Sequence, residues 1–227
     1  MLIDSKNAIK EAYSLGIVKK IYIKEGIKEQ AKSLLFNKEK IVYLSDFNFR
    51  KKFSYFNSNM VAEVDFNYVD LKSLLAKEER FIILDHIQDP QNFGTIIRAA
   101  HLFNFKNIII AKNNQVQVTN AVVRASAGSI FYVNICRVVN IARAVETLKD
   151  YNFFVYAIDI RSKKTIENIS LGNKFALIFG SEGKGIRKNL FSKSDDAFKI
   201  DIFGKIDSLN VSQSAAILLY EINKRKI

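Results

Sequence analysis

Apolar and polar positions follow two different spacings from Phe81 to the end of the chain. Strand-length apolar runs, rich in β-branched residues, recur as FIIL, NIIIA, FYVNI, FFVYAID, FALIFG and FKID. Between them, apolar residues recur at helical spacing near residues 92–103, 119–127 and 141–148, and a last helix is expected from about Ser208. Strands buried on both faces read as continuous apolar runs, so this alternation predicts an α/β fold with a mostly parallel sheet between helices.

A smaller α/β unit is predicted in front of that domain. A helical stretch around residues 8–15 precedes short strands, which we expect at residues 21–23, 41–44 and 61–64. The charged residues 77–80 then give way to the apolar FIIL, and this change in composition indicates a linker near residues 70–79. We therefore divide the chain into residues 1–75 and residues 76–227.

The net charge is +12, from 35 Lys and Arg against 23 Asp and Glu. A positive surface favours a polyanionic partner such as RNA, because cations that contact phosphates release condensed counterions. A Lys- and Asn-rich genome would produce the same composition, so charge alone leaves both interpretations open. The excess is spread over both parts, with 13 basic and 9 acidic residues up to Leu75 and 22 and 14 after it, which indicates a broad footprint.

The small numbers of cysteines and histidines limit which disulfides and metal sites the chain can form. Cys136 is the only cysteine, which excludes an intrachain disulfide and fits a reducing cytoplasm. The only histidines, His86 and His101, are too few and too poorly accompanied for a zinc site, so we expect no metal and interpret both as packing or surface residues. The apolar runs are far shorter than the ~20 residues that span a bilayer, and no signal peptide is expected, so we predict a cytoplasmic protein without a membrane segment.

Candidate chemistry should follow the strands FIIL, FALIF and FKI, because open parallel sheets bind ligands beyond the carboxyl ends of their strands. After the first of these, Asp89-Pro90 makes a turn and Asn92 is placed to cap the next helix. Arg98 lies more than one turn into that helix among apolar residues. Such an arginine is usually a partly buried member of an ion pair, and the alternative is a ligand-binding role.

The second segment, GSEGKGIRKNL, is a glycine-rich turn after FALIF. Gly180, Gly183 and Gly185 permit sharp turns and a close approach of the backbone to a ligand. The segment lacks the Lys and Ser or Thr of a Walker loop, and Lys188 stands where a dinucleotide fingerprint needs glycine. Glu182 would repel a phosphate, but it suits a cation or a ribose hydroxyl.

The third segment places Ser208, Leu209 and Asn210 at the start of the last helix, where Ser208 or Asp207 is expected as the cap. Residues 215–220 are apolar on nearly every face of that helix. This exceeds what packing on one core requires, so we expect part of the helix to pack on a second subunit.

Together the three segments resemble the signature motifs of the SpoU family of SPOUT methyltransferases, over about residues 81–223. The matching residues are Asn92, Gly94, Arg98 and Ala100, then Gly180, Glu182, Gly183 and Gly185, then Ser208, Leu209, Asn210, Val211 and Ser212. The opening NAIKEA and KKIYI are similar, more weakly, to the N-terminal RNA-binding domain of the branch that methylates guanosine of 23S ribosomal RNA. One departure is that Asp201, Ile202 and Phe203 stand where the family has Pro and Met.

The resemblance implies a C-terminal deep trefoil knot, an exception to unknotted topology, and a homodimer through the last helix. It implies S-adenosylmethionine as the cofactor, held by Gly180, Glu182, Gly183, Gly185, Ile200, Ser208 and Leu209. The catalytic residues that it implies are Asn92, Arg98, Glu182, Ser208 and Asn210.

The implied function is 2'-O-methylation of a ribose in ribosomal RNA. Transfer RNA is the alternative substrate, and a non-catalytic RNA-binding protein of ribosome assembly is a different class of function. Within the methyltransferase hypothesis, Arg98 is either a general base or, as we favour, the group that holds a phosphate and the developing alkoxide, because a guanidinium is a poor proton acceptor. Asn92 and Asn210 would orient the hydroxyl and the cofactor, and Glu182 would orient Arg98 or the ribose.

Overall fold

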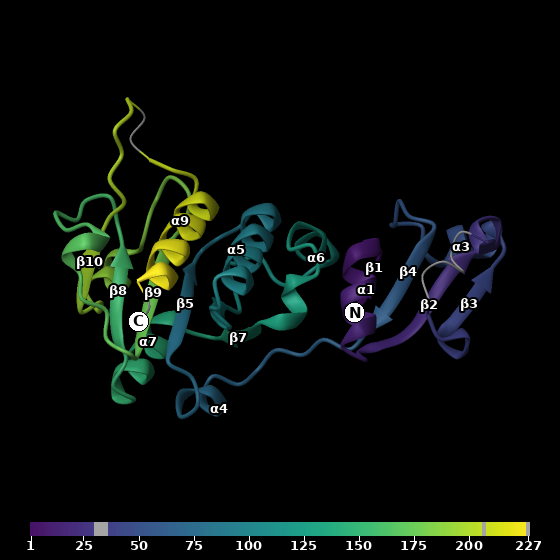
Figure 1. Cartoon of the computed structure of the whole chain (residues 1–227), viewed down its shortest axis with the longest axis horizontal. Helices are drawn as coiled ribbons and strands as arrows, with labels where there is room; N and C mark the ends of the chain where they lie inside the picture. Colours follow the sequence, from purple (N-terminus) through teal and green to yellow (C-terminus); the bar gives the residue numbers. More distant parts are fainter. Residues whose placement is uncertain (30–35, 206–207, 226–227) are drawn as a thin grey trace.

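The computed structural model describes residues 1–29, 36–205 and 208–225. Figure 1 shows an elongated molecule in which a small sheet and a larger one lie at different ends of the long axis. Helices α1 (Lys6–Ser14) and α6 (Asn120–Ala125) lie between the two sheets. Within the described ranges, no helix has the length and apolar character needed to cross a membrane.

The described strands of the first unit pair in the order β1-β4-β2-β3, with β2 parallel to β3 and the other pairs antiparallel. Alternate residues of β2 face opposite sides, so Ile21 and Ile23 pack with α1 while Tyr22 packs with α3. The elements bear out the expected helix and strands, and their bounds are β1 (Leu2–Ile3), α1, β2 (Val18–Lys24), β3 (Ile41–Leu44), α3 (Asp46–Lys52) and β4 (Met60–Val64).

The second unit is an α/β domain whose described strands are all parallel, in the order β10-β8-β9-β5-β6-β7. This confirms the predicted mostly parallel sheet. The strands are β5 (Arg80–Asp85), β6 (Asn107–Ala111), β7 (Asn134–Val138), β8 (Phe154–Ile158), β9 (Phe175–Gly180) and β10 (Asp196–Phe198). The helices are α4 (Lys72–Leu75), α5 (Pro90–Leu102), α6, α7 (Ile141–Asp150), α8 (Lys188–Phe191) and α9 (Val211–Lys224).

Two hydrophobic clusters cover the faces of the larger sheet. In β5, Ile82 and Leu84 pack with α5, α6 and α9, whereas Phe81 and Ile83 pack with α4, α7 and α8. Cys136 belongs to the second cluster, and burial raises the pKa of its thiol to about 12. The thiol therefore stays protonated at neutral pH and has little nucleophilic character.

Polar contacts join the two units. The buried Asp4 carboxylate accepts hydrogen bonds from Arg124 Nε at 2.7 Å and from Asn120 Nδ2 at 2.9 Å, both on α6. The Tyr132 hydroxyl donates to Glu11 Oε2 on α1 at 2.6 Å. The first unit is thus docked on α6 and on the turn that follows it.

Several expected boundaries are wrong. The proposed linker is packed, because Leu71, Leu74 and Leu75 are buried in the second cluster and Val69 bridges to Cys136 in β7. The expected strand FYVNI starts later, at Asn134, because residues 129–132 form a 3-10 turn after the left-handed Ala127 and Gly128. The strand expected as FKID ends at Phe198.

The helix caps also differ from the expectations. Asp89 caps α5, accepting from Gln91 N at 2.9 Å, and Pro90 occupies the first turn, so Asn92 lies inside the helix. Asn210 caps α9 in place of Ser208. Asp207, the other expected cap, lies outside the described residues.

Gly94 sets the distance between α5 and α6. A Cβ at this position would lie 2.3 Å from Ala125 Cβ and 2.9 Å from Val122 O. A Gly→Ala change in an ordinary helix interior gains about 1 kcal/mol, but here we expect overpacking to lower the free energy of unfolding by about 1–3 kcal/mol. Urea denaturation of Gly94→Ala would measure this loss. Thr95→Ala, an exposed position of the same helix, is the control and should not be destabilised; equal stability of the two variants would contradict the packing account.

Candidate functional site

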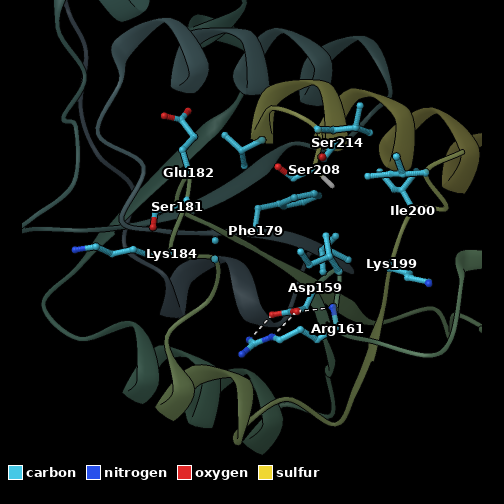
Figure 2. Close-up of a pocket in the computed structure, with 18 residues that line it drawn as sticks. Asp159, Arg161, Phe179, Ser181, Glu182, Lys184, Lys199, Ile200, Ser208 and Ser214 are labelled. Carbon is cyan, nitrogen blue, oxygen red and sulfur yellow. Dashed lines mark hydrogen bonds and ion pairs between the residues drawn. The ribbon is translucent and has the colours of Figure 1, made fainter. Parts of the chain in front are cut away.

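A pocket of about 350 Å³ lies beyond the carboxyl ends of the central and edge strands of the larger sheet. Residues that follow β8, β9 and β10, together with the start of α9, line it (Figure 2). The pocket brings together every residue that we predicted to hold the cofactor: Gly180, Glu182, Gly183, Gly185, Ile200, Ser208 and Leu209. Of the other predicted site residues, Asn92, Arg98 and Asn210 are not in its lining.

The glycine-rich loop, residues 180–186, is closed on itself by its own backbone. Ser181 N donates to Gly185 O at 3.2 Å, and Gly185 N donates to Ser181 O at 2.9 Å. Gly183 and Gly185 have φ of 76° and 65°, which favours glycine at both positions. A Cβ on Gly180 would lie 2.2 Å from Gly185 C and 2.3 Å from Ile186 N, so only glycine permits this close approach.

Glu182 links this loop to α5. Asn92 is buried, and its Nδ2 donates to Glu182 Oε1. Figure 2 shows the Glu182 carboxylate pointing away from Asp159, on the far side of the pocket. Asn92 therefore acts as a fixed partner of the loop, and the suggestion that it merely caps α5 is wrong. We expected Glu182 to orient Arg98 or the ribose; among the described residues the structure pairs it with Asn92 and not with Arg98.

Arg98 is exposed on α5. Among the described residues it has no hydrogen bond or ion pair, so the partly buried ion pair that an arginine in this setting usually forms is absent. Its exposed face also carries Thr95 and Leu102, at helical spacing from it. The guanidinium is therefore available to a ligand or a partner.

Asn210 holds the start of α9. Its Oδ1 accepts from Ser212 N at 2.8 Å and from Ser212 Oγ at 2.7 Å. No hydrogen bond of its Nδ2 is found in the part of the chain that the structure describes. Asn210 thus combines a capping oxygen with a free amide donor beside Ser208 and Leu209, which line the pocket.

An ion pair that the sequence did not reveal holds the other end of the glycine loop. Asp85, fully buried at the end of β5, accepts from Arg187 N at 3.0 Å and from Arg187 Nε at 2.8 Å. His86 Nδ1 lies 2.9 Å from the same carboxylate. Asp85 stands directly beside Gly180 in the β5–β9 register, so the carboxylate fixes where the loop returns to the sheet.

The floor of the pocket contains a second unpredicted pair, Asp159 and Arg161 (Figure 2). Arg161 donates from Nε at 2.8 Å and from Nη2 at 2.6 Å, and this hydrogen-bonded contact holds the pKa of Asp159 below its usual value. Asp159 follows β8, so the rule about carboxyl ends of strands would have identified it had we applied it to FFVYAID. In the described ranges, no group of three or more His, Cys, Asp or Glu side chains is arranged to hold a metal.

Comparisons with known proteins extend over both units. A Borreliella burgdorferi protein named as an uncharacterized tRNA/rRNA methyltransferase is 41% identical over 157 residues, 68% of this chain and 68% of the relative. The Bacillus subtilis protein YacO, named for the TrmH family of tRNA/rRNA methyltransferases, is 34% identical over 177 residues, 75% of this chain and 71% of the relative.

Among solved structures, the SpoU methyltransferase AviRb from Streptomyces viridochromogenes, crystallised with AdoMet, matches with a TM-score of 0.84 at 20% identity. The match covers 100% of this chain and 90% of AviRb, which shows a shared fold. The sequence profile described as the SpoU rRNA Methylase family matches residues 79–220. Because that match spans more than half of the chain and relatives exceed 30% identity, this chain belongs to the SpoU rRNA methylase family.

Proposed function

We propose that this protein transfers a methyl group from S-adenosyl-L-methionine to a ribose 2'-hydroxyl of ribosomal RNA, with a guanosine of 23S rRNA as the expected target, in the cytoplasm. The observation that carries the proposal is the closed glycine loop. It forms one wall of the pocket and holds Glu182 against Asn92. A family of RNA methyltransferases and an AdoMet-bound structural neighbour support the same reaction class.

The pocket residues fit this cofactor. Phe179, Ile200 and Leu209 supply apolar surface suited to a purine ring, and Asp159 supplies a carboxylate that suits hydroxyl or ammonium groups. The close approach at Gly180 leaves the loop backbone without a side chain at its tightest point. When bound, the cofactor supplies a methyl group already activated on a sulfonium.

The residues around the pocket then have to position a ribose hydroxyl and help it lose its proton. Asn92 is held by Glu182, and the free Nδ2 of Asn210 is a second amide donor for orientation. Exposed and unpaired among the described residues, Arg98 is placed to bind the adjacent phosphate and the developing alkoxide. Its guanidinium stays protonated at neutral pH, so in this proposal a phosphate oxygen or water accepts the proton.

Transfer RNA is the alternative substrate, since the names of both relatives include it. We favour ribosomal RNA because the described residues up to Val64 form a folded unit with its own sheet, which enlarges the basic footprint. A binding-only assembly protein would have no need of a closed glycine loop around a pocket. The proposal also includes a deep trefoil knot in the segment that carries β9, β10 and α9. It keeps the division into an N-terminal RNA-binding unit and a methyltransferase domain but moves the boundary ahead of α4, because Leu71, Leu74 and Leu75 are buried in the core of the second unit.

The proposed homodimer uses the exposed side of α9 and the neighbouring side of α5. Ile217 and Tyr220 are half-exposed on α9, and Leu102 is 64% exposed at the end of α5. The two helices meet there, because Phe103, the residue after Leu102, packs edge-on against Tyr220 at 5.6 Å. Leu102 shares its helix face with Arg98. Pairing through this surface would therefore bring Arg98 to the subunit boundary, where it would complete a site.

Analysis of the methylated product tests the reaction. Ribosomal RNA lacking the modification would be incubated with the protein and with cofactor carrying a labelled methyl group, then hydrolysed in alkali. A 2'-O-methyl group blocks the attack of the hydroxyl on its own phosphate, so the label should remain in alkali-resistant dinucleotides. Label in mononucleotides would indicate base methylation and refute the proposed chemistry, and the same assay with transfer RNA separates the two substrates.

Arg98→Ala should lower turnover in this assay by roughly 10²- to 10³-fold, the scale of one lost transition-state donor, with cofactor affinity and melting temperature near wild type. Arg98→Lys separates the two chemical roles, because lysine keeps the charge but lacks the planar fork. We expect it to stay poorly active across the pH range. Activity that recovers fully as pH rises would mean that position 98 serves as the base.

Tyr220→Lys combined with Ile217→Lys should yield monomers with little transferase activity, because two charges would be buried in an apolar contact. Val139→Lys is the matched control: Val139 is an 80% exposed apolar residue in another part of the domain. Sedimentation velocity measures the oligomeric state. A double variant that still sediments as the wild-type dimer would place the interface elsewhere.

A further inference from the structure

Two aromatic side chains at the far end of the first unit are left in solvent. Phe47 is 75% exposed on α3 and Tyr55 is 98% exposed just after it. Arg50 and Lys51 follow Phe47 at helical spacings of three and four residues, so the three share one face of α3. We refer to Phe47, Arg50, Lys51 and Tyr55 as the α3 surface.

The base of this surface is rigid. Phe49 and Phe53 are buried beneath α3, with their ring centroids 5.1 Å apart, and Tyr22 lies 5.0 Å from Phe53. Ser45 caps the helix by accepting from Asn48 N. Since α3 already buries its own apolar residues, Phe47 and Tyr55 add nothing to that core, and their exposure forgoes the stabilisation that burial would give.

The basic side chains of the α3 surface are also unpaired among the described residues. Neither Arg50 nor Lys51 has a hydrogen bond or ion pair within the described ranges. The neighbouring Lys52 packs over the Tyr22 ring at 4.1 Å, which keeps a third cation at the end of the helix. Cations interleaved with exposed aromatic rings match a ligand that has both phosphates and flat faces.

We infer that the α3 surface binds unpaired nucleotides of the RNA, with bases stacked on Phe47 and Tyr55 and phosphates beside Arg50 and Lys51. This inference rests on the proposed function, which supplies RNA as the substrate. Bases inside a duplex are stacked on each other, so a duplex would bind through its phosphates alone and could not stack a base on Phe47 or Tyr55. Figure 1 places α3 at the opposite end of the molecule from β9 and α9, so this contact grips RNA well away from the nucleotide that is methylated.

Equilibrium binding to two probes tests the inference, with oligouridine as the single strand and a blunt-ended RNA duplex as the comparison. Phe47→Ala combined with Tyr55→Ala should weaken oligouridine binding by roughly tenfold or more, the scale of losing base stacking, and leave duplex binding unchanged. Tyr151→Ala, which removes an exposed aromatic from the other unit, is the matched control and should change neither. Both mutated rings are exposed, so circular dichroism and melting temperature should match wild type.

Two further measurements separate stacking from charge. A single strand containing 2-aminopurine should lose fluorescence on binding wild type, because stacking quenches the base, and should lose much less on binding the double aromatic variant. Arg50→Gln combined with Lys51→Gln should reduce the slope of log K against log salt for the single strand by about 1.4, or about 0.7 for each lost phosphate contact.

The inference is overturned if the double aromatic variant binds oligouridine as wild type does, or if duplex and single strand lose affinity equally. It is likewise overturned if wild-type protein fails to bind oligouridine. Failure of the proposed function looks different: S-adenosyl-L-methionine would not bind, and no RNA would be methylated by wild type, whatever the α3 variants do to RNA affinity.

Discussion

The backbone contact between Gly180 and residues 185–186 is the constraint on which the site depends. Because Gly180 has no side chain, the loop can fold back until its two ends are joined by backbone hydrogen bonds between residues 181 and 185. Two neighbouring elements of the site are linked to that turn. Glu182 in the middle of the loop contacts Asn92 on α5, and Asp85 holds Arg187 where the loop returns to the sheet. Removing the close approach would therefore disturb a wall of the pocket and two links to neighbouring elements at once.

The two functional regions are held on separate rigid units. The pocket lies at the larger sheet, whose strands are buried on both faces, whereas the α3 surface lies on the unit with the smaller sheet. Figure 1 shows that the two sheets lie apart along the long axis. Asp4, clamped by Arg124 and Asn120, fixes the first unit to α6. Helix α6 in turn packs on α5 at Gly94, in the same helix as Asn92 and Arg98. A continuous path of packed elements thus joins the α3 surface, where we propose that RNA binds, to the proposed site of methyl transfer.

The sequence predicted most of the sheet because buried parallel strands are long apolar runs, and β5, β6, β8 and β9 are such runs. Prediction of the helix caps failed because several neighbouring residues are chemically suited to the same position. Asp89, Asn92, Ser208 and Asn210 are all good capping residues, and only the path of the chain decides which one caps. Residues 70–79 looked like a linker because they are charged, yet three leucines among residues 71–75 are buried.

In the site, too, features formed by neighbouring residues were predicted, whereas contacts between residues far apart in the sequence were not. The glycine loop was recognisable in the sequence itself, and the resemblance to the SpoU motifs supplied the predicted cofactor residues, because these belong to contiguous motifs. The contacts of Asp85 with Arg187 and of Asn92 with Glu182 join residues about a hundred positions apart, and periodicity carries no information about such pairs. The exposure of Arg98 was unpredictable for a related reason. It depends on where α6 and α9 pack around α5, and the burial pattern of α5 shows this only after folding.

Calorimetric titration of S-adenosyl-L-methionine into Gly180→Ala is the most direct test of the claim that the closed glycine loop makes the cofactor site. Gly172→Ala is the control, since a Cβ there meets nothing within 4 Å. We predict binding near one per subunit for wild type and for Gly172→Ala, and a loss of roughly 100-fold or more in affinity for Gly180→Ala, in a protein that remains folded at the temperature of the titration. Wild-type affinity in folded Gly180→Ala, or no binding by wild type, would contradict the account.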